Sequence, residues 1–419
     1  MFYRLIVNLR KPGNQLWLMP TAGALLALLI AAAAAWVNVF VPPSFLPDID
    51  LDTLQSLLDV IASSMLAVST FSLSIMVSAF SSASNGATPR ATELVMSDDN
   101  TRMAIASFIS AFIYAIIARV ALGLGYYGQN GRFALFIATL FVLLYLIITL
   151  IRWVHTLSLL GRLANTLSKI KAATQKPLRE VRLRPNLGAT WQGTVDDRAK
   201  ALRHNKSGFL THIDLAGLQK KAEDSDCYLH IMVRPGEMIL PSTVLALVQF
   251  RSNDDSEQAL ANMRSCFVVD VARSFEQDPA WGFLVMSEAG QRALSPAVND
   301  PGTAIQVMYD LMSLLIEEVE TDEAQASDSG FDRLSIVAID YQEWLVDAFL
   351  PLMRDGGHML EVNLVMQKVL AGIAQHAPES GVRHAAKEVA EVALERAEKA
   401  LVFDADRQRL REKHERLFA

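Results

Sequence analysis

Apolar residues in the first 160 positions gather into four long runs separated by short polar segments. An α-helix needs about 20 predominantly apolar residues to cross the hydrocarbon core of a bilayer. The runs that meet this length are Leu16–Val41, Val60–Phe80, Met103–Leu124 and Phe133–Leu157. Tryptophan and tyrosine residues near several of their ends are typical of a membrane interface. The pattern predicts an α-helical membrane protein with four transmembrane helices in residues 1–160.

The second run carries a stripe of small hydroxylated residues. Its members are Ser63, Thr70, Ser74, Ser78 and Ser81. Helical periodicity places all five on one side of a helix. Two interpretations remain open, because the hydroxyls could let neighbouring helices pack closely or could line a hydrated path. A single four-helix bundle fills its own interior, so a path would need a homo-oligomer with this helix around the symmetry axis.

Two charged residues lie inside the predicted spans. Asp59 enters the second span and Arg119 lies inside the third. Consecutive spans run in opposite directions, so both charges fall at similar depth. An ion pair between them would lower the cost of keeping either charge in the membrane. Alternatively, Arg119 extends past Gly123 and Gly125 to the membrane surface.

Charge is distributed unevenly along the chain. The chain is 52% hydrophobic and has a net charge of −7. This net charge is the sum of +1 in residues 1–160, +8 in residues 161–206 and −16 in residues 207–419. Basic residues precede the first run and follow the fourth, whereas the loop between the first two runs is acidic. The positive-inside rule therefore predicts a multi-pass protein of the inner (plasma) membrane with both termini in the cytoplasm. We expect residues 161–206 to form a basic juxtamembrane connector close to anionic lipid. The downstream acidic surplus argues against a nucleic-acid partner.

The remaining residues predict a cytoplasmic α+β region. Residues 207–270 alternate β-branched and aromatic positions with turns, which predicts a small β-barrel-like domain. The expected strands are Gly208–Asp214, Tyr228–Val233, Met238–Ile239 and Thr243–Phe250. Residues 271–419 predict a helical domain that ends in one long amphipathic helix, Ser380–Leu417. The two cysteines, Cys227 and Cys266, are expected to be reduced, buried thiols.

One polar string in the helical region is distinctive. Ser295-Pro296 predicts the end of one helix, and Asp300-Pro301 predicts the start of the next, with Asp300 as the N-cap. Helix capping explains this string without any ligand. A binding role is the alternative, and its candidate residues are Arg292, Ser295, Asn299 and Asp300.

Four strings make the chain resemble a known family. They are Phe71–Ile75, Ser81-Ser82 with Thr88–Arg90, Pro235–Glu237, and Gln277–Gly282 followed by Arg292–Pro301. In these strings, which span roughly residues 1–320, the chain resembles the predicted membrane proteins grouped as the domain of unknown function numbered 2254. The resemblance implies a fold and a membrane location, and it implies no activity.

Sequence motifs of common enzymes do not occur in the chain. There is no P-loop, no GxGxxG after a strand, no HExxH, no CxxC and no GxSxG. The eight histidines are scattered without metal-ligand spacing. We therefore expect no enzyme, no metal and no cofactor. Two functions remain open: a homo-oligomeric channel-like or transport-related protein for a small ion or solute, or a membrane-anchored scaffold or sensor. In a channel-like protein the cytoplasmic region would regulate transport. In a scaffold or sensor it would bind a partner or a small ligand.

Overall fold

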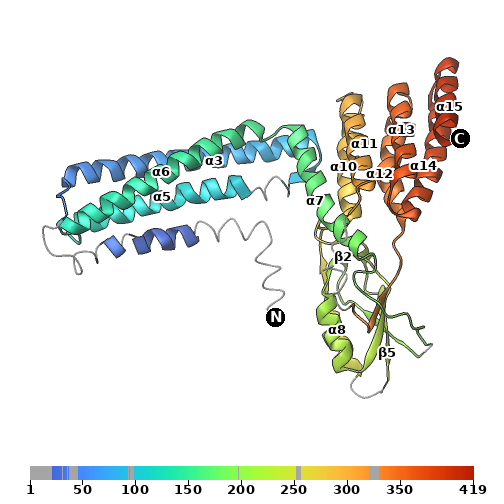
Figure 1. Ribbon diagram of the computed structural model, residues 1–419, viewed down its shortest axis with the longest axis horizontal. Helices are drawn as coiled ribbons and strands as arrows, with labels where there is room; N and C mark the ends of the chain where they lie inside the picture. Colours follow the sequence, from blue (N-terminus) through green and yellow to red (C-terminus); the bar gives the residue numbers. More distant parts are fainter. Residues whose placement is uncertain are drawn as a thin grey trace. The chain divides into compact units, whose positions relative to one another are not determined.

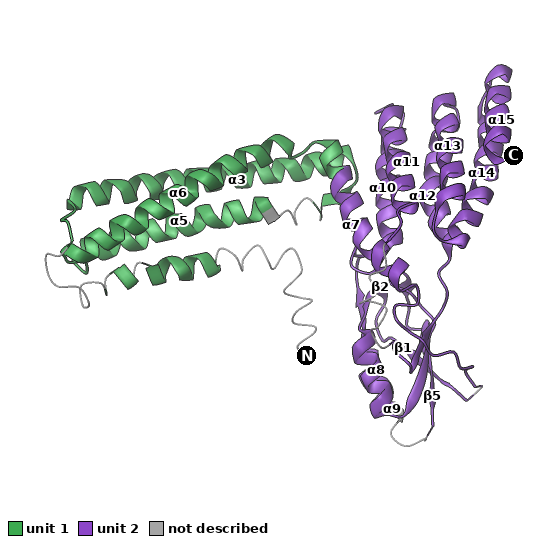
Figure 2. Cartoon of the chain, viewed as in Figure 1, with its two compact units in different colours: residues 1–166 green, residues 167–419 purple. Residues whose placement is uncertain are grey.

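The chain divides into two compact units. The computed structural model describes residues 21–30, 32–34, 36, 46–92, 94, 99–196, 198–251, 256–319 and 330–419. Unit 1 comprises Met1–Thr166 and unit 2 comprises Leu167–Ala419, as the colours of Figure 2 show. Unit 1 is helical where it is described, and unit 2 combines helices with two β-sheets. The protein is therefore mostly helical, and its named strands all belong to unit 2.

Three helices of unit 1 are long and apolar enough to cross a membrane (Figure 1). They are α3 (Leu51–Gly86), α5 (Asp99–Gly123) and α6 (Gln129–Leu159). They confirm the second, third and fourth predicted runs as helices, and each helix begins before its run does. With 36 residues, α3 is about 54 Å long at 1.5 Å per residue, compared with roughly 30 Å of hydrocarbon in a bilayer. Hydropathy therefore identified the apolar middle of α3 and missed its amphipathic or polar end turns.

The first predicted run, Leu16–Val41, falls partly outside the described residues. Its described part belongs to a short apolar helix, Thr21–Ala34, in which Ala27 and Ala34 are buried. This described part is shorter than the roughly 20 residues that a span requires, and most of the rest of the run lies outside the described residues. The described residues thus contain three candidate spans, and the predicted fourth is not confirmed.

Apolar side chains fill the middle of unit 1. Leu54 of α3, Phe108 of α5 and Leu135 of α6 are completely buried. The hydroxyls of Tyr114 and Thr139 form a buried hydrogen bond of 2.9 Å between α5 and α6. Polar bonds of this kind hold neighbouring helices together in an apolar surrounding. A packed core thus occupies the centre of the subunit.

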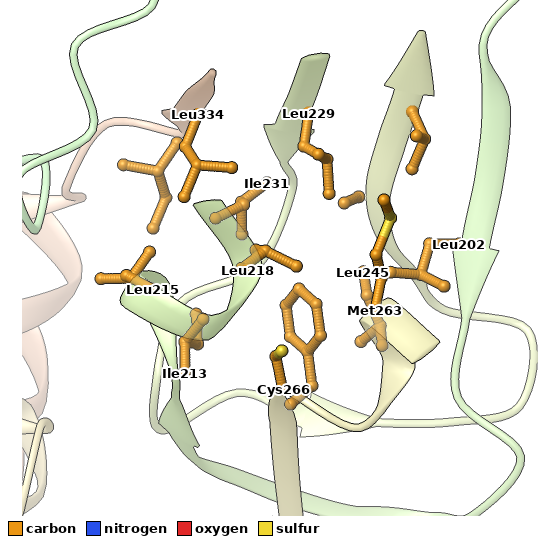
Figure 3. Packing of buried hydrophobic residues seen from close by; sticks show 14 of the residues in the cluster. Leu202, Ile213, Leu215, Leu218, Leu229, Ile231, Leu245, Met263, Cys266 and Leu334 are labelled. Carbon is orange, nitrogen blue, oxygen red and sulfur yellow. The ribbon is translucent and has the colours of Figure 1, made fainter. Parts of the chain in front are cut away.

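The strands of unit 2 form two sheets. One has the strand order β1-β5-β3-β7 and the other has the order β4-β2-β6. The strands are β1 (Lys200–Arg203), β2 (Gly208–Ile213), β3 (Cys227–Ile231), β4 (Met238–Ile239), β5 (Val244–Phe250), β6 (Phe267–Asp270) and β7 (Leu334–Ile336). Helices α8 (Leu215–Asp224) and α9 (Ser256–Arg264) contribute Leu218 and Met263 to the core that Figure 3 shows. Cys227 and Cys266 are buried free thiols, as expected.

The four predicted strands are confirmed within a residue or two, but the barrel-like arrangement is not. The strands form two separate sheets, and β3 pairs in parallel with β7, from a segment that the sequence predicted as helical. β6 lies at the end of the predicted β-rich segment, residues 207–270, but was not among the four expected strands. Both are short and buried among distant partners, so local patterning carried little signal for them.

The helical part of unit 2 is formed by seven helices of the described chain. They are α7 (Leu163–Leu183), most of which lies in this unit, α10 (Pro279–Ala293), α11 (Pro301–Leu315), α12 (Tyr341–Asp355), α13 (Leu360–His376), α14 (Ser380–Ala400) and α15 (Asp404–Phe418). Within unit 2, α10 to α15 lie together at one end and α8 and the sheets at the other (Figure 1). Each packs through one apolar face.

The single C-terminal helix predicted for Ser380–Leu417 is wrong. The chain breaks between Ala400 and Asp404, where Val402 is 93% exposed. The break lets α15 fold back and pack on α13. His414 Nδ1 of α15 lies 2.8 Å from Oε1 of Gln367 on α13. Acidic residues in the first turn of α15 also favour a new helix start there.

The expected lipid-facing connector is instead partly built into unit 2. Arg182 of α7 keeps only 5% of its side chain exposed and contacts the C-terminal end of α11. Lys171 forms an ion pair of 2.9 Å with Asp310. Gly282 of α10 lies so close to α7 that a Cβ atom there would collide with the Thr174 side chain. These contacts make α7 a structural helix of unit 2.

Candidate functional site

The hydroxyl stripe lies on the exposed surface of α3. Ser63, Thr70, Ser74, Ser78 and Ser81 are all exposed among the described residues. The buried face of the helix, which includes Leu54, Ile61 and Ala79, is on the opposite side at about 100° per residue. The packing interpretation required burial against helices of the same subunit, and the described helices do not provide it.

The hydroxyl protons along the stripe are used within α3 itself. Ser63 donates a hydrogen bond of 2.8 Å to the carbonyl of Asp59, and Thr70 donates one of 3.0 Å to Leu66. Ser74 donates to the carbonyl of Thr70 at 3.1 Å. Such i−4 bonds satisfy the donors and leave the hydroxyl oxygens able to accept. The stripe therefore presents a row of acceptor atoms.

The two intramembrane charges are brought together. The guanidinium of Arg119 on α5 forms an ion pair with the carboxylate of Asp59 on α3. The side chains are 43% and 51% exposed, respectively. Asp59 precedes Ser63 by one helical turn, so the pair borders the end of the stripe. Pairing, rather than extension of Arg119 alone to the surface, is the arrangement in the structure.

The string around Ser295 forms a capped turn between α10 and α11. Asp300 Oδ1 accepts a hydrogen bond of 3.0 Å from the Thr303 amide, and Pro301 is the first helical residue, as predicted. Ser295 donates its hydroxyl proton to the carbonyl of Arg292 at 2.7 Å. Asn299 adopts a left-handed φ of 49° and keeps an exposed side chain. Hydrogen bonds from Thr303 lower the pKa of Asp300. The observed contacts of Ser295 and Asp300 are those of helix capping.

Unit 2 contains a cavity that the sequence did not indicate. Its volume is about 350 Å³, and its walls come from α7 and the residues after it, residues 234–238, residues 273–280 and residues 337–347. Two strings that make the chain resemble the family, Pro235–Glu237 and the beginning of Gln277–Gly282, meet there. The sequence presented the first as a tight turn, and only the fold brings it against the second.

A buried ion pair forms one wall of this cavity. Arg273 donates two hydrogen bonds, of 2.8 and 3.0 Å, to the carboxylate of Asp278. Asp278 also accepts from the Trp281 amide at 3.1 Å and so caps α10. Burial raises the pKa of Asp278, and the bonds from Arg273 offset part of that rise. The Asp278-Pro279 pair repeats the capping signal of Asp300-Pro301.

Two other carboxylates at the cavity also have raised pKa values. Burial raises the pKa of Glu237, the hydrogen bond of 2.6 Å from the Arg234 amide lowers it, and the charges of Glu343 and Arg234 act in opposite directions. Burial also raises the pKa of Asp347, although Arg273 acts in the opposite direction. Perturbed carboxylates in a concave site are typical of functional positions.

Replacement of Asp347 by asparagine is expected to stabilise the protein at neutral pH. An acid whose pKa is raised in the folded state contributes stability below its unfolded pKa of about 4, and loses it as the pH rises through the folded pKa. Asp347→Asn should therefore raise Tm at pH 7.5, and the difference should shrink as the pH falls towards 4.5. Thermal unfolding of the full-length protein in detergent measures this, with Glu415→Gln, at an exposed position of α15, as the control. A lower Tm for Asp347→Asn at pH 7.5 would contradict it.

Membrane-length apolar helices in unit 1 and a sheet-containing helical unit 2 define the class as a membrane protein with an attached α+β unit. The chain belongs to the family described as "Predicted membrane protein (DUF2254)", whose model matches residues 13–372. The match confirms the resemblance seen in the four strings.

Curated relatives come from mycobacteria. The chain is 24% identical over 213 residues to "Uncharacterized protein Mb1321c" of Mycobacterium bovis and to "Uncharacterized protein Rv1290c" of Mycobacterium tuberculosis. Each match covers 48% of this chain and 40% of the relative. The chain thus spans two fifths of the length of these relatives. No solved structure matches it significantly.

Proposed function

We propose that the protein is a homo-oligomeric, channel-like protein of the inner membrane, in which α3 of each subunit lines a shared hydrated path for a small ion or solute. Both termini and unit 2 lie in the cytoplasm, where unit 2 regulates the path. The observation that carries this proposal is the exposed hydroxyl stripe, which lies opposite the buried face of α3. Polar groups in membrane helices face a helix partner or water rather than lipid, and within the described subunit this stripe has no covering helix.

In a homo-oligomer the hydroxyl stripe would line the shared path instead of facing lipid. Exposed Leu66 and Val77 flank it on one side and Phe71 on the other. In a closed symmetric ring these apolar residues would contact neighbouring subunits, and the hydroxyls would face the axis. The acceptor oxygens of Ser63, Thr70 and Ser74 suit water and small hydrated ions. The Asp59–Arg119 pair would lie at one end of this lining.

Cysteine accessibility tests the path. Ser74→Cys and Ser78→Cys are introduced separately after Cys227 and Cys266 are replaced by alanine, and proteoliposomes are treated with a membrane-impermeant thiol reagent. We expect labelling at both positions. Ser72→Cys is the matched control, because Ser72 lies on the buried face and is 0% exposed. We expect no labelling there.

Conductance gives the second measurement. Purified protein in planar bilayers or liposomes should conduct above background, and modification of Ser74→Cys or Ser78→Cys should reduce that conductance. Absence of labelling at both positions, together with background conductance, would rule out the hydrated path.

A membrane-anchored sensor without transport is the second candidate. The cavity in unit 2 favours it, because a concave site with perturbed carboxylates suits a small ligand whether or not unit 1 conducts. Conductance separates the two candidates, since only the first predicts a conducting path through unit 1.

A further inference from the structure

The cavity of unit 2 has the size of a site for a small molecule. Its volume of about 350 Å³ lies within the range of typical ligand pockets. Its walls come from four parts of the chain, so it forms only when α7, the turn before β4 and the starts of α10 and α12 are all in place. A cavity that depends on the whole fold in this way is held in one shape.

Close contacts and hydrogen bonds fix the backbone around the cavity. Gly236 has a φ of +103°, and a Cβ atom at this position would lie 2.5 Å from Oδ2 of Asp278. The turn at residues 234–237 therefore rests directly on the buried Arg273–Asp278 pair. Arg234 is also committed to the frame, since it donates hydrogen bonds of 2.9 Å to the carbonyls of Val337 and Pro185.

The charges that remain available at the cavity are negative. Five acidic and two basic side chains line it: Glu237, Asp278, Asp340, Glu343 and Asp347, with Arg234 and Arg273. Arg273 neutralises Asp278, and Asp340 is used to cap α12 through the Glu343 amide at 3.0 Å. Arg234 offsets part of the charge of Glu237, so the lining keeps a net negative charge to which Glu237, Glu343 and Asp347 contribute. A cation in the cavity would relieve the repulsion between these carboxylates.

The lining favours an organic cation over a bare metal ion. No group of three His, Cys, Asp or Glu side chains in the described parts of the chain is arranged to hold a metal. Apolar side chains make up much of the remaining wall: Val181, Leu187, Met238, Val337, Ile339 and Trp344. A ligand with an alkyl body and one charged end would match both parts. An aromatic wall also suits a cationic group.

We propose that the cavity binds a small organic cation, an alkylamine or alkylguanidine, whose charged group is attracted by Glu237, Glu343 and Asp347 and whose alkyl part lies against the apolar wall. The site is assigned to unit 2 alone and does not depend on a path through unit 1. A ligand there would contact the starts of α10 and α12 and the turn at residues 234–237 together.

Calorimetric titration of the full-length protein in detergent tests the site. The probes are n-butylamine, 1,4-diaminobutane and n-butylguanidine, with n-butanol as the neutral control, butyrate as the anionic control and Mg²⁺ as the metal control. We expect saturable binding of at least one cationic probe, at least tenfold tighter than n-butanol or butyrate. Because this contact is an attraction between opposite charges, which dissolved salt screens, the affinity should fall as salt is raised.

Matched variants locate the binding. Glu343→Gln combined with Asp347→Asn keeps the side-chain shapes and removes two charges, so affinity for the best probe should fall at least tenfold. Glu415→Gln, at an exposed position of α15 outside the cavity, should leave this affinity unchanged. The proposal is overturned if no cationic probe exceeds n-butanol, if Mg²⁺ binds in their place, or if the double variant, still cooperatively folded, binds as well as the parent.

Discussion

Replacement of Arg182 by alanine is expected to lower the free energy of unfolding of unit 2 by about 3–5 kcal/mol, because it removes one partner of a buried ion pair. Arg182 donates a hydrogen bond of 2.7 Å from Nε to Glu379, and its Nη atoms donate to the carbonyls of Leu314, Leu315 and Glu317 at 2.7–2.9 Å. The carbonyls of Leu314 and Leu315 lie in the last turn of α11, and that of Glu317 follows the helix. Carbonyls at a helix end have no helical amide to accept from. Alanine would leave these carbonyls, and the partly buried Glu379, without this donor.

Two variants of the same helix serve as references for Arg182→Ala. Arg182→Lys keeps the charge but loses the planar fork of donors, so its cost should lie between those of the parent and alanine. Arg179→Ala, at an exposed position of α7, should change stability by less than about 0.5 kcal/mol. Denaturant unfolding of the full-length protein in detergent, followed by tryptophan fluorescence, measures all three. A loss below about 1 kcal/mol for Arg182→Ala would show that α7 is not held in unit 2 as described.

Replacement of either Asp59 or Arg119 by alanine is expected to destabilise unit 1 by about 1–3 kcal/mol, because each change leaves a charge within an apolar helix bundle without its partner. The double alanine variant should cost less than the sum of the two single changes, since the second replacement removes a charge that is already unpaired. The charge exchange Asp59→Arg with Arg119→Asp should recover part of the loss.

Unfolding of the full-length protein by increasing SDS in mixed micelles measures this coupling. Asp52→Ala is the matched control, because Asp52 is exposed on the same side of α3 in its first, more polar turn. Its effect should stay below about 1 kcal/mol. Additive single effects, together with a charge exchange no more stable than either single variant, would show that the ion pair contributes nothing to unit 1.

Local patterns predicted well wherever a strong local rule applies. The apolar runs around Val60–Phe80 and Phe133–Leu157 lie within α3 and α6, because hydrocarbon length imposes a long uniform signal. The capping signal of Asp300-Pro301 located the start of α11, because an N-cap bond and the fixed φ of proline are both local. Depth placed Asp59 and Arg119 at the same level and left their pairing as one of two alternatives, and the structure shows the pair.

Prediction failed where distant segments decide the environment of a residue. The basic run from Lys169 to Arg184 gave no sign that one of its cations is buried, yet the Arg182 side chain is only 5% exposed. Its partners, the end of α11 and Glu379, lie more than 130 positions away. β7 likewise gains its place only by pairing with β3. The cavity of unit 2 has the same origin, because Gly236 and Asp278 approach each other only in the folded protein.

By itself, the sequence determined three membrane-length helices, the four strands β2 to β5, the capped turn at Asp300 and the family, because helical and strand periods and caps are set by neighbouring residues. Only the tertiary structure decided which face of α3 is left exposed. It also decided that Arg182 binds Glu379 and the end of α11 inside unit 2, and that a negatively charged cavity forms beside Asp278. Those outcomes depend on contacts between residues far apart in the chain, and such contacts leave no period or spacing in the sequence.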